Sequence, residues 1–189
     1  MRIISGSNKG KKLIMPIDKT TRPLKDMAKE SIFNILTHAK HINFRLKDSR
    51  VLDLFSGVGS FGLECISRGS KFVFFLENYA PVLEILKINI SNLKYENKSK
   101  VINNYGFEIN NNSFEDNQKF QIIFCDPPYK EKKIELLIEK IIEMDVLEKN
   151  GIVIIHRKKG DFDNYPNNFK VIDKKNYGLS TFVFGRKSN

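Results

Sequence analysis

The chain has 189 residues, of which 41% are hydrophobic and 29% are charged, so it can bury one ordinary core in one domain. Its apolar runs, such as residues 72–76 and 152–155, fall far short of the roughly 20 residues that cross a bilayer. The start of the chain has a basic residue but no apolar stretch of about 7 to 15 residues behind it, so no secretory signal is expected. These features exclude a membrane-spanning protein and favour a cytoplasmic one.

The positive charge lies at the two ends of the chain. Residues 1–50 carry a net charge of +8, residues 51–155 carry −3 and residues 156–189 carry +5. Segregated Lys and Arg suit a polyphosphate partner, because each neutralised phosphate releases counterions. A solvated Lys-rich surface is the alternative, but composition alone does not move charge to the ends, so we favour nucleic acid.

The first fifty residues predict a basic extension. Residues 2–14 are typical of a small hairpin, and residues 25–39 have the spacing of a helix whose inner face includes Ala28 and Ile32. Lys25 and Lys29 then share another helix face. Together with Arg22 they are expected to form a basic surface.

From residue 50 onward the chain alternates short apolar runs with helical segments, which indicates strand-helix-strand units and a mostly parallel sheet. The expected strands are 50–55, 71–77, 100–104, 120–126 and 151–156. The expected helices begin at Pro81 and at Ile134, the second ending at Asn150 and Gly151. Residues 103–118 are expected to form a loop or short helix, and residues 167–186 a closing antiparallel hairpin.

A glycine-rich loop follows the first of these strands. Gly57, Gly59 and Gly62 stand between a predicted strand and a predicted helix, the context that gives a G-x-G-x-x-G pattern its meaning. Glycine lets the backbone turn sharply and approach a ligand. Glu77 ends the next strand, where a carboxylate accepts the hydroxyls of a ribose. A nucleoside cofactor is therefore predicted, while a structural turn would leave Glu77 unexplained.

Asp53 favours one nucleoside over another. This acid precedes the first glycine by four residues and would repel a pyrophosphate, whereas it suits a ligand with an ammonium and a sulfonium. The prediction is S-adenosylmethionine rather than a nicotinamide dinucleotide.

A second motif, Asp126-Pro127-Pro128-Tyr129, follows the fourth strand and should face the same crevice. The prolines lack N–H groups, so the turn presents hydrogen-bond acceptors to an amino group. Tyr129 offers a flat face on which a base could stack. Holding the methyl donor and the acceptor amine in line would supply most of the rate acceleration. These four residues are the predicted catalytic turn.

These motifs resemble the class I methyltransferases, and within them the RsmD-type methyltransferases of guanine N2 in 16S ribosomal RNA. The residues that carry the resemblance are Arg2 to Leu13, Thr21 to Pro23, Lys29 to Asn34, Asp53 to Gly62, Asp126 to Tyr129 and Tyr177-Gly178. It implies a Rossmann-like domain over residues 50–189, with a seven-stranded sheet, and a packed hairpin-helix extension over residues 1–49. It also implies methylation of one guanine in ribosomal RNA, alone or in a small-subunit assembly particle. Separately, we expect a monomer. No metal site is expected, because the two cysteines have no paired spacing and His38 and His41 have no third ligand type nearby.

The resemblance implies roles for individual residues. Cofactor contacts are expected from Asp53, Phe55, Gly57, Gly59, Gly62, Glu77 and Tyr105, and RNA contacts from Lys9, Lys11, Lys12, Arg22, Lys25 and Lys29. Three positions depart from the family pattern. Met27 stands where a basic residue is expected. Tyr105 stands where a small polar or acidic residue commonly contacts adenine, and Tyr129 stands where the family has a phenylalanine.

Other functions stay open at this point. A methyltransferase of adenine N6 in DNA or another RNA shares the Asp-Pro-Pro-Tyr motif, although 189 residues leave little room for a target-reading segment. A protein-glutamine methyltransferase usually has Asn in place of Asp126. A nicotinamide oxidoreductase leaves Asp53 and the proline turn unexplained. A non-catalytic RNA-binding factor would have no use for an intact Asp126.

Overall fold

The structure is a computed structural model, and it describes residues 1–17, 24, 26–42 and 44–188. Two of the predicted RNA contacts, Arg22 and Lys25, lie outside the described residues. Over the described part of the chain, no helix is long and apolar enough to cross a membrane.

The described residues form one seven-stranded sheet in the order β3-β2-β1-β4-β5-β7-β6. Strands β1 to β5 are parallel, whereas β7 is antiparallel to both β5 and β6. The strands are β1 Arg50–Leu54, β2 Phe72–Leu76, β3 Ser99–Ile102, β4 Phe120–Cys125, β5 Leu147–Lys158, β6 Phe169–Tyr177 and β7 Ser180–Lys187. This topology confirms the predicted mostly parallel sheet with a terminal antiparallel hairpin.

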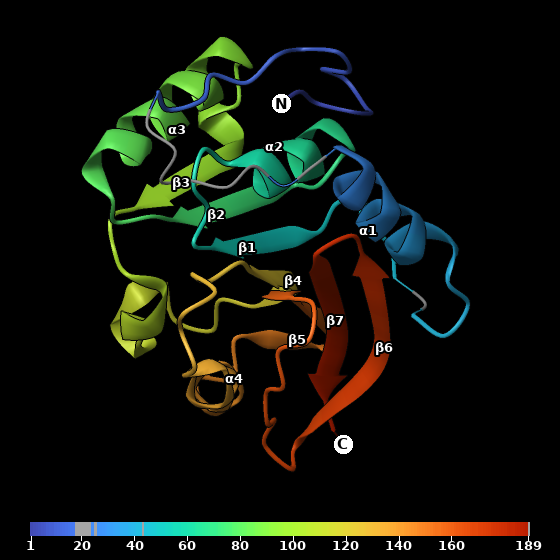
Figure 1. The fold of residues 1–189 in the computed structure, drawn as a ribbon. Helices are drawn as coiled ribbons and strands as arrows, with labels where there is room; N and C mark the ends of the chain where they lie inside the picture. Colours follow the sequence, from blue (N-terminus) through green and yellow to red (C-terminus); the bar gives the residue numbers. More distant parts are fainter. Residues whose placement is uncertain (18–23, 25, 43, 189) are drawn as a thin grey trace.

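Helices cover both faces of the sheet, which explains why its strands have nearly continuous apolar sequences. Helices α1 (Asp26–His38), α2 (Ser60–Ser67) and α3 (Ala80–Asn92) lie on one face and α4 (Ile134–Glu143) on the other (Figure 1). Successive residues of β4 point to opposite faces. Ile122 and Phe124 join the core under α2 and α3, while Ile123 and Cys125 join the core under α4. Cys65 and Cys125 are both buried and free.

The predicted end of α4 is wrong. The helix ends at Glu143, and Asp145 takes a left-handed conformation with φ 49°. The chain then enters β5, in which Leu147 pairs with Phe120. Gly151 lies inside this strand, so the Asn150-Gly151 pair marks no helix end. Leu147 is buried, and this burial draws the segment into the sheet against its local helical spacing.

The N-terminal extension is joined to the core of the sheet. Residues 2–14 form a small hairpin with a bridge between Arg2 and Lys12, and the N–H of Ile3 donates to the carbonyl of Lys11. Ile3, Leu13 and Ile32 are buried in the same cluster as residues of the strands. Residues 106–108 and 111–113 form short 3-10 helices, as expected for the segment between β3 and β4.

Lys29 does not lie on a basic surface, so this part of the predicted RNA face is wrong. Its side chain is fully buried, and its ammonium lies 3.5 Å from the equally buried carboxylate of Glu64 and donates to the carbonyl of Arg2. Burial lowers the pKa of Lys29. Glu64 also accepts from the N–H groups of Ile4 and Ser5 at 2.7 and 3.0 Å. The pair thus ties the hairpin, α1 and α2 together.

We expect Glu64→Ala to lower the free energy of unfolding by about 3–5 kcal/mol, because it leaves the buried ammonium of Lys29 without its partner. Urea denaturation measures this loss. The matched control is Glu84→Ala, which removes the exposed carboxylate paired with Lys87 on α3 and should cost about 1 kcal/mol or less. Equal losses in the two variants would contradict this account of the buried pair.

Candidate active site

The loop between β1 and α2 has the tight turn that its glycines predict. Gly57 and Gly59 have φ values of 54° and 84°, and Gly59 precedes the first turn of α2. A Cβ at Gly59 would lie 2.5 Å from Leu86 Cδ1. The loop therefore packs directly against α3 and leaves its other side open to the cavity described below.

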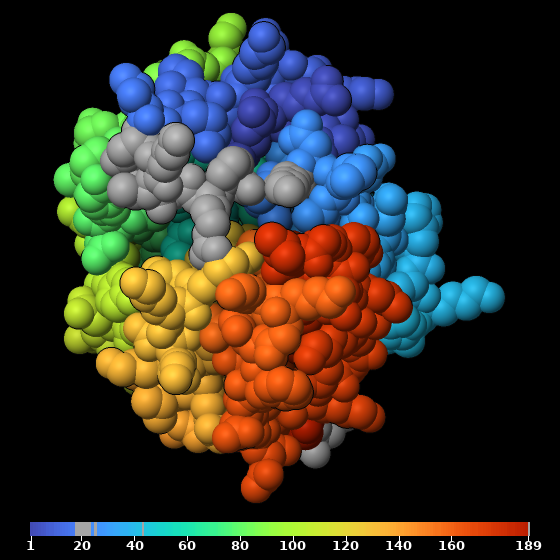
Figure 2. Space-filling model, viewed as in Figure 1, coloured from blue at the N-terminus to red at the C-terminus, as the bar shows by residue number. Residues whose placement is uncertain are grey.

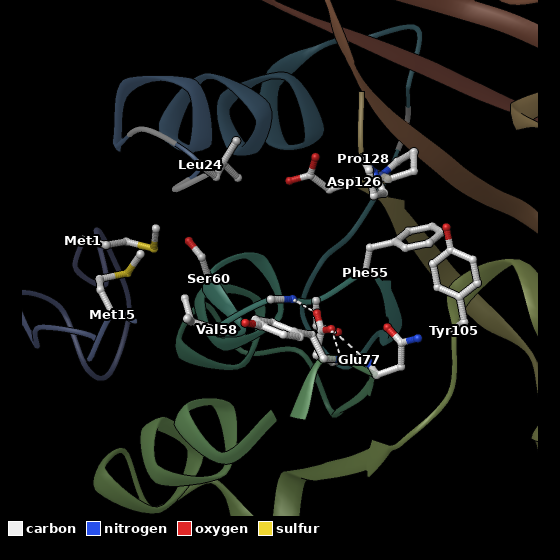
Figure 3. A pocket seen from close by; sticks show the side chains of 15 residues that line it. Met1, Met15, Leu24, Phe55, Val58, Ser60, Glu77, Tyr105, Asp126 and Pro128 are labelled. Atoms are coloured by element: carbon white, nitrogen blue, oxygen red, sulfur yellow. Dashed lines mark hydrogen bonds between the residues drawn. The ribbon is translucent and has the colours of Figure 1, made fainter. Parts of the chain in front are cut away.

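The carboxylate of Glu77 holds this loop in place. Its Oε2 accepts from the N–H of Gly57 at 2.8 Å, and its Oε1 accepts from the N–H groups of Asn78 and Tyr79 at 2.9 and 2.8 Å (Figure 3). A carboxylate has about four acceptor positions. Three are used here, so Glu77 keeps acceptor capacity toward the cavity.

Asp53 and Gly62 lie behind the loop rather than in the cavity wall. The N–H of Gly62 donates to Asp53 Oδ2 at 2.9 Å, and Asp53 is buried. Burial raises the pKa of this carboxyl well above its ordinary value. A Cβ at Gly62 would lie 2.3 Å from the ring of Phe75, so this glycine lets α2 approach β2. Both residues shape the loop, and the structure gives neither a place among the residues that line the cavity.

One cavity of about 470 Å³ joins the two predicted motifs. The loop contributes Phe55, Ser56, Gly57 and Val58, the end of β2 contributes Glu77, and the turn after β4 contributes Asp126, Pro127 and Pro128 (Figure 3). Its volume lies in the range of small-molecule sites. Met1, Met15 and Leu24 line the cavity from the N-terminal extension.

Asp126 stands at the end of a chain of hydrogen bonds. Its Oδ1 lies 2.8 Å from Nδ1 of His156, whose Nε2 lies 2.8 Å from Oγ of Ser180. The imidazole of His156 is buried and stacks on the ring of Phe182, with centroids 4.5 Å apart. A neutral imidazole that donates from Nδ1 to Asp126 and accepts at Nε2 satisfies every member of this chain.

Tyr129 does not line the cavity. Its hydroxyl lies 3.3 Å from Nε2 of His156, and its ring meets the imidazole edge-on at 5.7 Å. The hydroxyl of Tyr129 is therefore turned toward His156, and the ring expected to stack on a base is not part of the cavity lining. Tyr129 is linked to Asp126 through His156.

Two aromatic side chains form the side of the cavity near β3. Phe55 has φ 61° and meets Tyr105 edge-on, with ring centroids 5.7 Å apart. A Cβ at Gly106 would lie 2.5 Å from the ring of Phe55, so glycine is needed where this ring packs. The hydroxyl of Tyr105 donates to Glu131 at 3.5 Å. Burial, followed by the charge of Glu131, raises the pKa of Tyr105.

The remaining basic candidates lie along the N-terminal hairpin. Lys9, Lys11 and Lys12 are exposed. The extension starts at the cavity, which Met1 lines. Farther along the hairpin, the N–H of Ser7 donates to the carbonyl of Ser67, at the end of α2 that points away from the glycine loop. Since eight helical residues span about 12 Å, the hairpin runs away from the cavity. Lys9, next to its turn, is the most distant of the three.

Sequence reasoning missed His156 and Ser180. The signal for His156 was present, because it lies near the carboxyl end of a predicted parallel strand, as Asp126 does, and such strand ends share one edge of the sheet. Ser180 offers no comparable signal. It reaches the site only because β7 pairs with β5, with Phe182 opposite His156.

Comparison with known proteins gives a consistent assignment. The family model "Conserved hypothetical protein 95" matches residues 1–186. Bacillus subtilis YlbH is 32% identical over 188 residues, covering 99% of each chain. The "Ribosomal RNA small subunit methyltransferase D" of Haemophilus influenzae is 31% identical, covering 96% of this chain and 91% of that one.

Solved structures share the fold. The Escherichia coli protein yhhF has a TM-score of 0.82 at 24% identity, over 100% of this chain and 98% of that one. The structure of SMU.776, complexed with SAH, has a TM-score of 0.66 at 15% identity, over 83% of this chain and 48% of that one. The fold is that of the class I methyltransferases. With the match over residues 1–186 and these relatives, the chain belongs to the Conserved hypothetical protein 95 family, the family of the RsmD-type methyltransferases.

Proposed function

We propose that this protein transfers a methyl group from S-adenosylmethionine to the 2-amino group of a guanine in small-subunit ribosomal RNA. The observation that carries the proposal is the single cavity shared by the glycine loop, Glu77 and the Asp126 turn. Relatives named for methylation of small-subunit ribosomal RNA support the substrate. The proposed partner is that RNA or its assembly particle, and the proposed working state is a monomer.

The residues of the cavity fit S-adenosylmethionine. Glu77 has acceptor capacity left for ribose hydroxyls, and Phe55 and Tyr105 offer apolar ring surface for the adenine. The backbone of Gly57 faces open space, since a Cβ on this residue would have no atom within 4 Å, so a ligand can approach it closely. Asp53 and Gly59 would act indirectly, by fixing the shape of this loop. When bound, S-adenosylmethionine supplies an electrophilic methyl group on its sulfonium.

The Asp126 turn would orient the acceptor amine. Asp126 and the carbonyls beside Pro127 and Pro128 accept hydrogen bonds from the amine, so that the nitrogen lone pair points at the methyl carbon. The new C–N bond forms as the S–C bond breaks, and the proton then lost by the amine passes to Asp126 or to water. Correct alignment of this kind contributes up to about 7–11 kcal/mol.

The direct test is methylation of 16S ribosomal RNA, or small subunits, from cells that lack this protein. With labelled S-adenosylmethionine we expect label in N2-methylguanosine, identified by mass spectrometry of nucleosides. Asp126→Ala should lose turnover by about a hundredfold or more and keep its affinity for S-adenosylhomocysteine. Label in N6-methyladenosine, or binding without transfer, would overturn the proposal, and lost cofactor affinity in Asp126→Ala would mean that its role is misassigned.

We infer that His156 is a positioning residue that holds the carboxylate of Asp126. His156→Phe keeps the ring stacked on Phe182 and removes the bond to Asp126, and we expect kcat to fall about 10- to 100-fold with little change in KM. His156→Asn retains a donor near Nδ1 and should recover most of the rate. A purely structural role would instead give equal losses of folding stability and rate in the two variants.

For the hairpin we propose contacts to RNA phosphates. Replacing Lys9, Lys11 and Lys12 by Ala should weaken RNA binding and lower the slope of log K against log salt by about 2, because three phosphate contacts are lost. Lys149→Ala with Lys170→Ala, two exposed lysines outside the hairpin, is the control. An unchanged slope in the triple variant would remove the hairpin from the RNA face.

A further inference from the structure

A fully exposed aromatic side chain stands on the loop that follows β5. Phe162 is 97% exposed, the most exposed aromatic residue among the large hydrophobic residues that the structure describes. Scattered exposed apolar residues are common on proteins and need no function. The surroundings of Phe162 therefore decide whether it has one.

The loop that carries Phe162 is held in place from both sides. Arg157 is buried, donates from Nε to Asp163 at 2.8 Å and from Nη2 to the carbonyl of Glu131 at 3.0 Å. The N–H of Asp161 donates to the carbonyl of Lys158 at 3.1 Å. The ring is thus exposed on a fixed segment, next to the loop after β4.

The charges around this loop are arranged by sign. The acids Asp161 and Asp163 both lie within ion-pair distance of the buried Arg157, at 3.7 and 2.8 Å. The lysines point outward instead. We call four exposed ones, Lys130, Lys132, Lys158 and Lys159, the lysine rim. In the described part of the chain, none of the four is in an ion pair with a carboxylate.

The lysine rim borders the proposed active site. Cys125 pairs with Ile155, so Asp126, just past β4, lies beside His156, which is still within β5. The rim lysines follow within six residues of one or the other. Arg157 joins the two loops, which Figure 2 shows as neighbouring yellow and orange surface. Met1 and Met15, which flank the N-terminal hairpin, line the other side of the cavity (Figure 3).

We propose that the lysine rim and Phe162 bind the single-stranded RNA that flanks the target nucleotide, with Phe162 stacking on one of its bases. A base stacks on an aromatic ring whatever its sequence, and the lysines follow the phosphates. A protein partner is disfavoured, because protein interfaces are poor in Lys. The inference rests on the proposed function and names the surface that holds its substrate.

The test measures binding apart from catalysis. Fluorescence anisotropy with a labelled 12-nucleotide oligouridine gives Kd, and calorimetry gives the affinity for S-adenosylhomocysteine. We expect Phe162→Ala to raise the Kd for RNA about tenfold with cofactor affinity unchanged, and Phe162→Tyr to keep the wild-type Kd. The control Leu136→Ala, on the exposed side of α4 at 54% exposure, should change neither.

The lysines have their own readout. Lys158→Ala with Lys159→Ala should lower the salt slope of oligouridine binding by about 1 to 2. An unchanged Kd in Phe162→Ala would overturn the proposal, and so would a change in sedimentation that shows Phe162 to bury itself between two copies of the chain. If the wild-type protein binds oligouridine as expected but transfers no methyl group to ribosomal RNA, the result would count against the proposed function alone.

Discussion

The parallel pairing of β1 with β4 is the constraint on which the rest of the site depends. Leu54 pairs with Cys125, and the N–H of Asp126 donates to the carbonyl of Leu54 at 3.3 Å, so the two strands end together. Two segments about seventy residues apart in the chain are thereby brought to one edge of the sheet. Without that register, the glycine loop and the proline turn would have no cavity in common, and a cofactor and a base could not react.

The side chains of three acids fix the segments around this edge of the sheet, two of them buried and the third, Glu77, partly exposed. Asp53, Glu64 and Glu77 each accept backbone N–H groups, from α2, from the hairpin and from the glycine loop respectively. Asp53 and Glu77, which look like ligand contacts in the sequence, thus spend much of their hydrogen-bonding capacity on the backbone, and Glu77 does so while still facing the cavity.

Much of the fold could be predicted because periodicity reports burial. The strand runs, Pro81 at the start of α3 and the closing hairpin all follow from local pattern, and the strand-end rule brings Glu77 and Asp126 together. The features that were predicted wrongly or missed depend on tertiary contacts. Helical spacing could not show that residues 147–150 enter β5 by pairing with β4, or that Lys29 finds a buried partner in Glu64. It also could not show that β7 brings Ser180 to His156.

In the proposed reaction, one cavity holds the methyl donor beside the target base. A crystal structure of the protein with S-adenosylhomocysteine is the decisive test. We predict ribose hydroxyls bonded to Glu77, the adenine beside Phe55 and Tyr105, and the sulfur facing the Asp126 turn. A ligand bound at another surface, or in this cavity with its sulfur turned away from Asp126, would contradict the account.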